Sequence, residues 1–346
     1  MSLLLPLVVF AVAGTAVYVA GVYLSDSTDV LAVRWGLGGL ALLAIVTNLP
    51  ELVITTSAAL GDNLPLAIGN ILGGIAIQTL VLVYLDAVGV GRSENLTYRA
   101  ASLTLVLEGI LVIAVLIVVI MGSQLPGTIV FARVTPPEIL IVLLWVAGLV
   151  LVSKARTDLP WHAGGSPPEA QSEPHGGAKR KNAAGISGVT ASHAIAVFLL
   201  AAAVTLVGGV ALERSSSMLA DGIGMSGAVF GATVLAAVTS LPEISTGLTA
   251  VRLGDYQLAV SDIFGGNAFL PALFLLASIV SGQAVLPTLT GVDIYLAGLG
   301  GLLTTVYVTG VIFRPRYQLW RMGFDSLVVL LLYGVGILGL VSITAT

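Results

Sequence analysis

Residues 47–51 read TNLPE, and residues 239–243 read TSLPE, so one polar motif occurs twice at an offset of 243 − 51 = 192 positions. The similarity continues downstream, where LAIGNILGG at 66–74 matches LAVSDIFGG at 258–266. A Gly-Asp pair separates the two parts of each copy. The chain is therefore an internal duplication in which each half carries one copy.

The sequence around these motifs has the composition of membrane helices. Of 346 residues, 57% are hydrophobic and only 9% are charged, against about 25% charged residues in a soluble domain. Hydropathy separates ten segments near the length that crosses a bilayer. They cover 3–24, 30–60, 65–87, 98–121, 136–153, 190–212, 218–251, 257–281, 288–312 and 320–344. We predict an all-α integral membrane protein with ten transmembrane helices.

One polar stretch divides these spans five and five. Residues 154–189 are rich in Gly, Pro, Ser and charge, a composition typical of a linker. The predicted organisation is a first five-helix repeat (1–153), the linker (154–189) and a second five-helix repeat (190–346). Because each half has an odd number of spans, the second repeat must be inverted in the membrane, as in many secondary transporters.

Basic residues predict the orientation. Twelve of the 14 Lys and Arg residues lie in or beside odd-numbered connections, and only Arg133 and Arg214 lie on even ones. The positive-inside rule then places the 154–189 linker in the cytoplasm and both termini outside. We expect the plasma, or inner, membrane as the location.

Composition also excludes several classes of function. The net charge of −4 leaves no basic surface for DNA or RNA. The chain has no cysteine for a thiolate metal site or nucleophile, and it has no H-E-x-x-H or G-x-S-x-G motif. We expect that the protein is not an enzyme and carries no resident cofactor.

The prolines of the repeated motif interrupt their helices. Pro50 has no N–H for the carbonyl of Val46, and Pro242 has none for the carbonyl of Val238. An unpaired carbonyl in hydrocarbon costs several kcal/mol unless it lines a cavity or meets a ligand. Both carbonyls are therefore candidate ligands.

A glutamate follows each proline, and burying one charge at mid-membrane costs at least about 2.5–3.5 kcal/mol. Carboxylate, hydroxyl, amide and carbonyl oxygens are the ligands that Ca²⁺ or Na⁺ prefers. The side chains that offer them in the two motifs are Glu51, Glu243, Thr47, Thr239, Asn48 and Ser240. The sequence therefore predicts a cation site built from both copies.

The downstream blocks supply a second wall. Residues four apart share a helix face, which gives one stripe of Asn70, Gly74 and Gln78 and a matching stripe of Asp262, Gly266 and Leu270. Gln78 and Asp262 need partners inside the membrane, so we count both as candidate ligands. We expect Asn70 at the outward mouth and Asp262 at the inward mouth of the site.

The two motifs and the five-plus-five organisation resemble the alpha repeats of the cation/calcium exchanger superfamily, in particular the sodium/calcium exchangers. The resemblance implies cation ligation by Glu51, Glu243, Thr47 and Thr239, with Asn48 and Ser240 at the family's serine positions. The chain departs from the family pattern at Gly74, Gly266, Ile75 and Leu270. Leu270 replaces a carboxylate or amide of many sodium/calcium exchangers, which leaves the full set of sodium sites open.

The resemblance implies a secondary active antiporter that exchanges Ca²⁺, or another divalent cation, for Na⁺ or H⁺ by alternating access. A Ca²⁺/H⁺ exchanger without sodium coupling is the alternative, and a cation channel is a weaker one because an inverted repeat suits a transporter. The expected partners are inorganic cations and the lipid bilayer, with a monomer as the functional unit. With two carboxylates in the core, we expect electroneutral exchange of two monovalent ions per divalent ion, unless Asp262 reaches the core.

Five further acidic residues lie in or near the spans. Asp86, Glu138, Asp293 and Asp325 are near predicted helix ends, where we expect them to reach water. Glu108 is deeper in its span and is a candidate proton relay.

Overall fold

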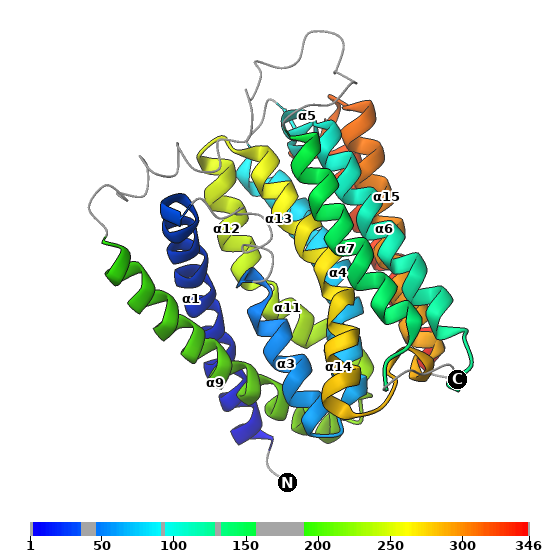
Figure 1. Cartoon of the computed structure of the whole chain (residues 1–346). Helices are drawn as coiled ribbons and strands as arrows, with labels where there is room; N and C mark the ends of the chain where they lie inside the picture. Colours follow the sequence, from blue (N-terminus) through cyan, green and yellow to red (C-terminus); the bar gives the residue numbers. More distant parts are fainter. Residues whose placement is uncertain (1–2, 36–45, 91–93, 129–132, 157–189, 345–346) are drawn as a thin grey trace.

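The chain folds into a single helical bundle (Figure 1). The computed structural model describes residues 3–35, 46–90, 94–128, 133–156 and 190–344. Within these residues, nine helices are long and apolar enough to cross a membrane, and one further apolar helix is shorter. The second predicted span includes residues 36–45, which lie outside the described residues, so the count of ten stays a prediction.

The elements follow one another as helices with short 3-10 and π segments and one small hairpin. The first half contains α1 (Leu4–Trp35), α3 (Leu49–Leu60), α4 (Leu64–Tyr84), η1 (Leu85–Gly89), α5 (Leu96–Ala100), α6 (Leu103–Ser123) and α7 (Pro136–Ala155). The second half contains α9 (Ala191–Ile223), α10 (Gly227–Phe230), η3 (Gly231–Leu235), α11 (Ala236–Thr239), α12 (Leu241–Arg252), α13 (Tyr256–Phe269), η4 (Leu270–Ala272), α14 (Leu273–Ser281), η5 (Leu286–Thr288), α15 (Gly291–Phe313), β1 (Gln318–Leu319), β2 (Met322–Gly323) and α16 (Phe324–Thr344).

The first helix of each half is longer than hydropathy predicts. The expected ends at residues 24 and 212 are wrong, because α1 runs to Trp35 and α9 to Ile223. Their polar residues do not break the helices because the hydroxyls bond to the preceding turn. Ser27 Oγ donates to the carbonyl of Tyr23 at 2.6 Å, and Ser215 Oγ donates to that of Ala211 at 2.6 Å. The two long helices pack along each other on one flank of the bundle (Figure 1).

The extension of α9 buries a glutamate that hydropathy places in a loop. Glu213 accepts hydrogen bonds from Ser57 Oγ at 3.0 Å and from Asn63 Nδ2 at 3.2 Å. These contacts join α9 to the end of α3 and to the turn that follows it. Sequence reasoning missed this residue because the polar run at 213–217 resembles the end of a span.

The repeated motif does interrupt its helices, as predicted. A break at Asn48 precedes α3, and a break at Ser240 separates α11 from α12. The two break residues adopt nearly the same backbone torsion angles, φ −91° and ψ 19° at Asn48 and φ −85° and ψ 3° at Ser240. The two copies of the motif therefore have the same local structure.

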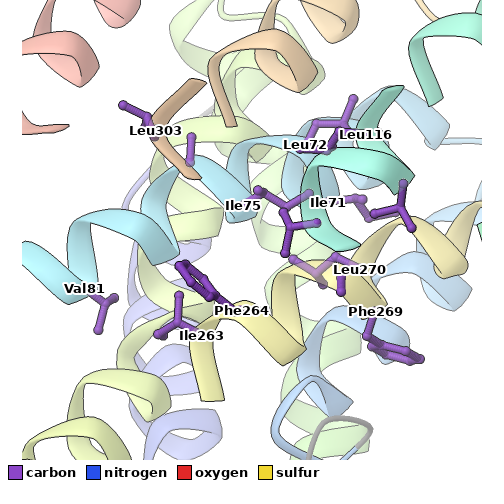
Figure 2. Packing of buried hydrophobic residues seen from close by; sticks show 14 of the residues in the cluster. Ile71, Leu72, Ile75, Val81, Leu116, Ile263, Phe264, Phe269, Leu270 and Leu303 are labelled. Carbon is purple, nitrogen blue, oxygen red and sulfur yellow. The ribbon is translucent and has the colours of Figure 1, made fainter. Parts of the chain in front are cut away.

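Helix α4 lies in the centre of the bundle and is buried along most of its length. Because lipid tails are as apolar as the side chains, close packing of small residues holds such helices together. A Cβ at Gly69 would collide with the backbone of Ala228, and one at Gly73 with that of Ala232. This face of α4 therefore meets α10 and η3 backbone to backbone. Figure 2 shows another part of the core, where Ile71 and Ile75 of α4 lie beside Leu270.

The expectation that four acidic side chains reach water is wrong. Asp86, Glu138, Asp293 and Asp325 are all buried. Glu138 and Asp293 complete capping boxes at the starts of α7 and α15, where a carboxylate satisfies backbone N–H groups. A position near a helix end therefore does not mean contact with solvent here.

Candidate cation site

Each half contributes one buried carboxylate to the centre of the bundle. Glu51 lies in the first turn of α3 and is 1% exposed, and Glu243 lies in the first turn of α12 and is 3% exposed. The two carboxylates lie close enough to interact electrostatically. Each sits at a helix N-terminus, where the helix dipole favours negative charge. The breaks before α3 and α12 therefore create two such ends inside the bundle.

The oxygens of these carboxylates form no hydrogen bond with the described residues. This holds for Oε1 and Oε2 of both Glu51 and Glu243. The same is true of both polar atoms of the buried Gln78 side chain, which have no partner there. Buried polar groups are nearly always paired, so four unpaired carboxylate oxygens in one buried pair indicate a place for a cation, although the amide donors Gln78 Nε2 and Asn70 Nδ2 are unpaired as well.

One of the predicted hydroxyl residues lies beside the pair. Thr239, at the end of α11, lies near the carboxylate of Glu51, and its hydroxyl donates to Asn70 Oδ1 at 3.4 Å. Thr47 and Asn48 are both buried and contact each other, with Asn48 Nδ2 at 3.4 Å from Thr47 Oγ1. Asn70 is fully buried, so the expectation that it lines an open mouth is wrong in this conformation.

The break residues do not use their side chains to cap the helices that follow them. Ser240 Oγ instead donates to the carbonyl of Ala236 at 2.8 Å. The N–H of Ser240 meets the carbonyl of Val238 in the same turn, so that carbonyl is not wholly unpaired. Val46 is helical and packs in a small cluster with Ala20 and Leu24. A ligand role for the carbonyls of Val46 and Val238 stays a prediction.

Gly266 of α13 brings two of the predicted amides together. A Cβ at this position would lie 3.0 Å from Asn48 Nδ2 and 3.5 Å from Gln78 Oε1. The side chains of α4 and of the break before α3 therefore occupy the space that a larger residue would fill. At the neighbouring Gly265, a Cβ would have no atom within 4 Å among the described residues, so no backbone approaches closely there.

Asn267 is a further candidate ligand that the sequence analysis did not name. It is fully buried, its Nδ2 donates to the carbonyl of Ile75 at 3.4 Å, and no described residue donates to its Oδ1. Its counterpart in the first half is the apolar Ile75. A search for residues shared by both copies therefore passes over it, although the family pattern places an amide at this position.

Asp262 lies beside the pair rather than at a distance from it. Thr246 Oγ1 donates to Asp262 Oδ2 at 3.0 Å and to the carbonyl of Glu243 at 3.3 Å. The Asp262 carboxylate is partly exposed and close enough to Glu243 to interact electrostatically. A narrow cavity of about 30 Å³, lined by Asp262, Ser261 and Gly265, opens next to it.

Leu270 replaces a polar ligand, as the sequence indicates. Its side chain is fully buried, and its Cδ1 lies 3.4 Å from a Cβ position at Gly74. The space between α4 and η4 is therefore filled by apolar packing (Figure 2). The second half lacks one oxygen that the resemblance suggests.

Glu108 has a partner that the sequence did not reveal. Its Oε1 accepts hydrogen bonds from Arg156 Nη2 at 3.2 Å and from Ser261 Oγ at 3.0 Å. Arg156 caps the end of α7 and reaches between α6 and α13. This ion pair offsets the charge of Glu108. A proton relay through this carboxylate stays a prediction.

The chain is similar to one known protein family and to several curated proteins. The family model described as sodium/calcium exchanger protein matches residues 5–156 and 193–341. The inner membrane protein YrbG of Escherichia coli (strain K12) is 27% identical over 237 residues, which cover 67% of this chain and 65% of that protein. The putative antiporter CaxA of Alkalimonas amylolytica is 27% identical over 236 residues, with the same coverage. The chain thus spans slightly less than two thirds of these relatives.

Two solved structures share the fold at low sequence identity. The structure of the H⁺/Ca²⁺ exchanger CAX has a TM-score of 0.69 and 16% identity, and covers 96% of this chain and 82% of that chain. A structure of the sodium-calcium exchanger NCX_Mj has a TM-score of 0.58 and 16% identity, covering 97% of this chain and 98% of that chain.

Proposed function

The chain belongs to the sodium/calcium exchanger protein family, and we propose that it is a secondary active antiporter that exchanges Ca²⁺, or another divalent cation, for Na⁺ or H⁺. Both structural neighbours are exchangers of Ca²⁺, one against H⁺ by its name and the other against Na⁺. The ions are the transported substrates, and the mechanism needs no resident cofactor.

The observation that carries this proposal is the pair Glu51 and Glu243. Two buried carboxylates whose oxygens lack donors in the described chain are costly unless a cation neutralises them. Ca²⁺ matches their combined charge of −2, and the hydroxyls and amides of Thr47, Thr239 and Asn267 supply the neutral oxygens that a hard cation takes.

The two copies of the motif can account for alternating access. If the halves are inverted relative to each other, the same motif faces opposite sides of the membrane, and exchanging the conformations of the two halves exposes one site to each side in turn. The matching breaks at Asn48 and Ser240 support this symmetry. A channel would need a continuous pore, whereas the paired glutamates are enclosed.

The coupling ion is either Na⁺ or H⁺. One feature of the site favours H⁺ over Na⁺. Leu270 removes an oxygen from the second half, and a proton needs no ligand beyond the carboxylate that it binds. Two protons on Glu51 and Glu243 would then replace one Ca²⁺. Sodium would have to be held by the remaining oxygens.

We place residues 154–189 in the cytoplasm and both termini outside, in the plasma or inner membrane. The described helices support this arrangement, because α1 begins and α16 ends at the same end of the bundle (Figure 1). Since one chain contains both copies of the motif, a monomer is sufficient to form the site. The proposed activity is transport without chemical conversion of a substrate.

The test is uptake of ⁴⁵Ca²⁺ into proteoliposomes that contain the purified chain. An outward Na⁺ gradient, an outward H⁺ gradient and no gradient are compared at zero membrane potential. Uptake that depends on one of the gradients supports the antiporter and identifies the counter-ion. Equal uptake under all three conditions would instead indicate a channel.

A further inference from the structure

Two aspartates form a second buried acidic cluster, apart from the paired glutamates. Asp86 lies in η1 after α4, and Asp325 lies in the first turn of α16. They are 1% and 4% exposed and close enough to interact electrostatically. The cluster lies near α5 and the last turn of α15, at the end of the bundle away from the chain termini (Figure 1).

Asp86 has a complete set of structural contacts. Its Oδ1 accepts a hydrogen bond from the backbone N–H of Leu96 at 2.7 Å. Its Oδ2 accepts from the N–H of Gly323 at 2.6 Å and from Ser326 Oγ at 2.7 Å. This carboxylate therefore ties α5 and the β1–β2 hairpin to the end of α4.

Asp325 differs because no described residue donates a hydrogen bond to either of its oxygens, both of which are buried. Two glycines make room for its carboxylate. A Cβ at Gly323 would lie 2.5 Å from Asp325 Oδ1, and a Cβ at Gly310 would collide with Oδ2. The fold thus encloses a negative group whose oxygens form no hydrogen bond with the described residues.

Further oxygens lie around Asp325. The hydroxyl of Thr97 is near its carboxylate. Tyr307 OH lies 3.3 Å from Ser326 Oγ and interacts electrostatically with both aspartates. All of these side chains are buried, so the cluster presents two carboxylates and three hydroxyls to one enclosed region.

Among the described residues, no Lys or Arg side chain forms an ion pair with Asp86 or Asp325. The ion pairs found there join Arg99 to Glu94 and Arg156 to Glu108. The basic side chains that precede the hairpin lie instead against the ring of Tyr98, with the guanidinium carbons of Arg314 and Arg316 at 5.6 and 5.0 Å from its centroid. Two buried carboxylates without a counter-charge are costly.

We propose that Asp325 and Asp86 form a second binding site for a divalent cation, with Ca²⁺ as its ligand, separate from the exchange site. Oxygen ligands of this kind suit a hard cation, and one Ca²⁺ balances the two negative charges. Asp325 supplies the open oxygens, and Thr97 and Tyr307 supply neutral ones. A cation bound here ties α4 to α15 and α16. The site does not depend on exchange, so it can exist even if the proposed transport reaction is wrong.

The test measures binding with the exchange site removed. The full chain carrying Glu51→Gln and Glu243→Gln is purified in detergent, and ⁴⁵Ca²⁺ binding is measured by equilibrium dialysis. We expect about one Ca²⁺ to remain bound per chain. Adding Asp325→Asn should weaken this binding at least tenfold. Asp293→Asn is the matched control, because Asp293 is also a buried aspartate in the first turn of its helix, and it should leave the binding unchanged.

Absence of residual binding in the Glu51→Gln, Glu243→Gln protein at millimolar Ca²⁺ would overturn the proposal, whatever the transport assays give. Residual binding that survives Asp325→Asn would overturn it as well. If Asp325→Asn does not fold, Thr97→Val takes its place, since it removes one hydroxyl at nearly constant volume. It should weaken the residual binding several-fold, and unchanged affinity in a folded Thr97→Val protein would contradict the site.

Discussion

The amide of Asn267 donates a hydrogen bond to the backbone carbonyl of Ile75 at 3.4 Å, although the two residues are 192 positions apart. This separation equals the offset between the two copies of the motif, so the residues occupy the same place in the two halves. The halves therefore meet where their equivalent positions touch. At this contact the symmetry is broken, because one half offers an amide and the other an apolar side chain.

Asn267→Ile should weaken Ca²⁺ binding, because it makes the second half match the first and removes the Oδ1 acceptor. We expect the apparent Michaelis constant for ⁴⁵Ca²⁺ uptake to rise about tenfold, which corresponds to about 1.4 kcal/mol. The measurement is initial uptake as a function of Ca²⁺ in proteoliposomes with equal amounts of folded protein. An unchanged Michaelis constant would remove Asn267 from the site.

Gly266→Ala and Gly265→Ala form a matched pair of neighbouring substitutions. The new methyl group at 266 would lie 3.0 Å from Asn48 Nδ2, whereas the one at 265 meets no described atom within 4 Å. Gly266→Ala should displace the Asn48 and Gln78 amides and raise the Michaelis constant for Ca²⁺ several-fold. Gly265→Ala should transport like the unmodified protein. Equal effects of the two substitutions on the Michaelis constant would show that they act through helix packing and not through the cation site.

The repeated motif was sufficient to predict the helix breaks and the buried pair of glutamates. Pro50 and Pro242 predicted the helix breaks, and the glutamates that follow them are buried together. The sequence did not predict Asn267, because its counterpart Ile75 hides it from any search for repeated polar residues. Nor did it predict that Thr246 links Asp262 to the helix of Glu243, because that contact joins two different helices.

Hydropathy failed where polar side chains found partners inside the bundle. Ser27 and Ser215 bond to carbonyls of their own helices, so α1 and α9 continue through segments that average as polar. Asp86 and Asp325 were expected to reach water because they lie near the ends of predicted spans, but they too are enclosed by the bundle. Position along a span gives the depth of a residue, but tertiary packing determines whether water reaches it.

Asp262→Asn should have a sided effect on transport. Its carboxylate is partly exposed beside Glu243 and lies toward the end of the bundle that we place in the cytoplasm. A mouth carboxylate raises the local cation concentration through its field, so the variant should weaken Ca²⁺ capture from that side about threefold or more. Vesicles of known orientation measure this.

Asp221→Asn is the control for that experiment, since Asp221 is an exposed residue near the end of α9 at the opposite side. It should change cytoplasmic capture little. Equal weakening from both sides by Asp262→Asn would make Asp262 a ligand or a structural partner of the site.

Exchange should be electroneutral. Glu51 and Glu243 together give −2, which one Ca²⁺, two Na⁺ or two protons neutralise. A third monovalent ion would leave a net +1 at the pair at a cost of about 2–3 kcal/mol, and the carboxylate of Asp262, which is partly exposed, is not enclosed with the pair. Initial rates of exchange in proteoliposomes with clamped membrane potential should therefore be independent of voltage. A reversal point that shifts as expected for one net charge per cycle would refute this stoichiometry.

In the proposed mechanism the two glutamates bind the transported dication together. Replacing either one leaves Ca²⁺ facing a single charge and removes about 8 kcal/mol of attraction between a double and a single charge at about 4 Å and an effective dielectric near 20, equivalent to nearly a millionfold in affinity. Glu138→Gln is the control, because Glu138 is an equally buried glutamate that caps α7 outside the site.

Gradient-driven ⁴⁵Ca²⁺ uptake by Glu51→Gln, Glu243→Gln and Glu138→Gln proteins, reconstituted in equal amounts, is the decisive measurement. Uptake should fall to background in the first two variants and stay close to that of the unmodified protein in the third. Near-normal Ca²⁺ uptake by Glu51→Gln or by Glu243→Gln would contradict the two-glutamate site.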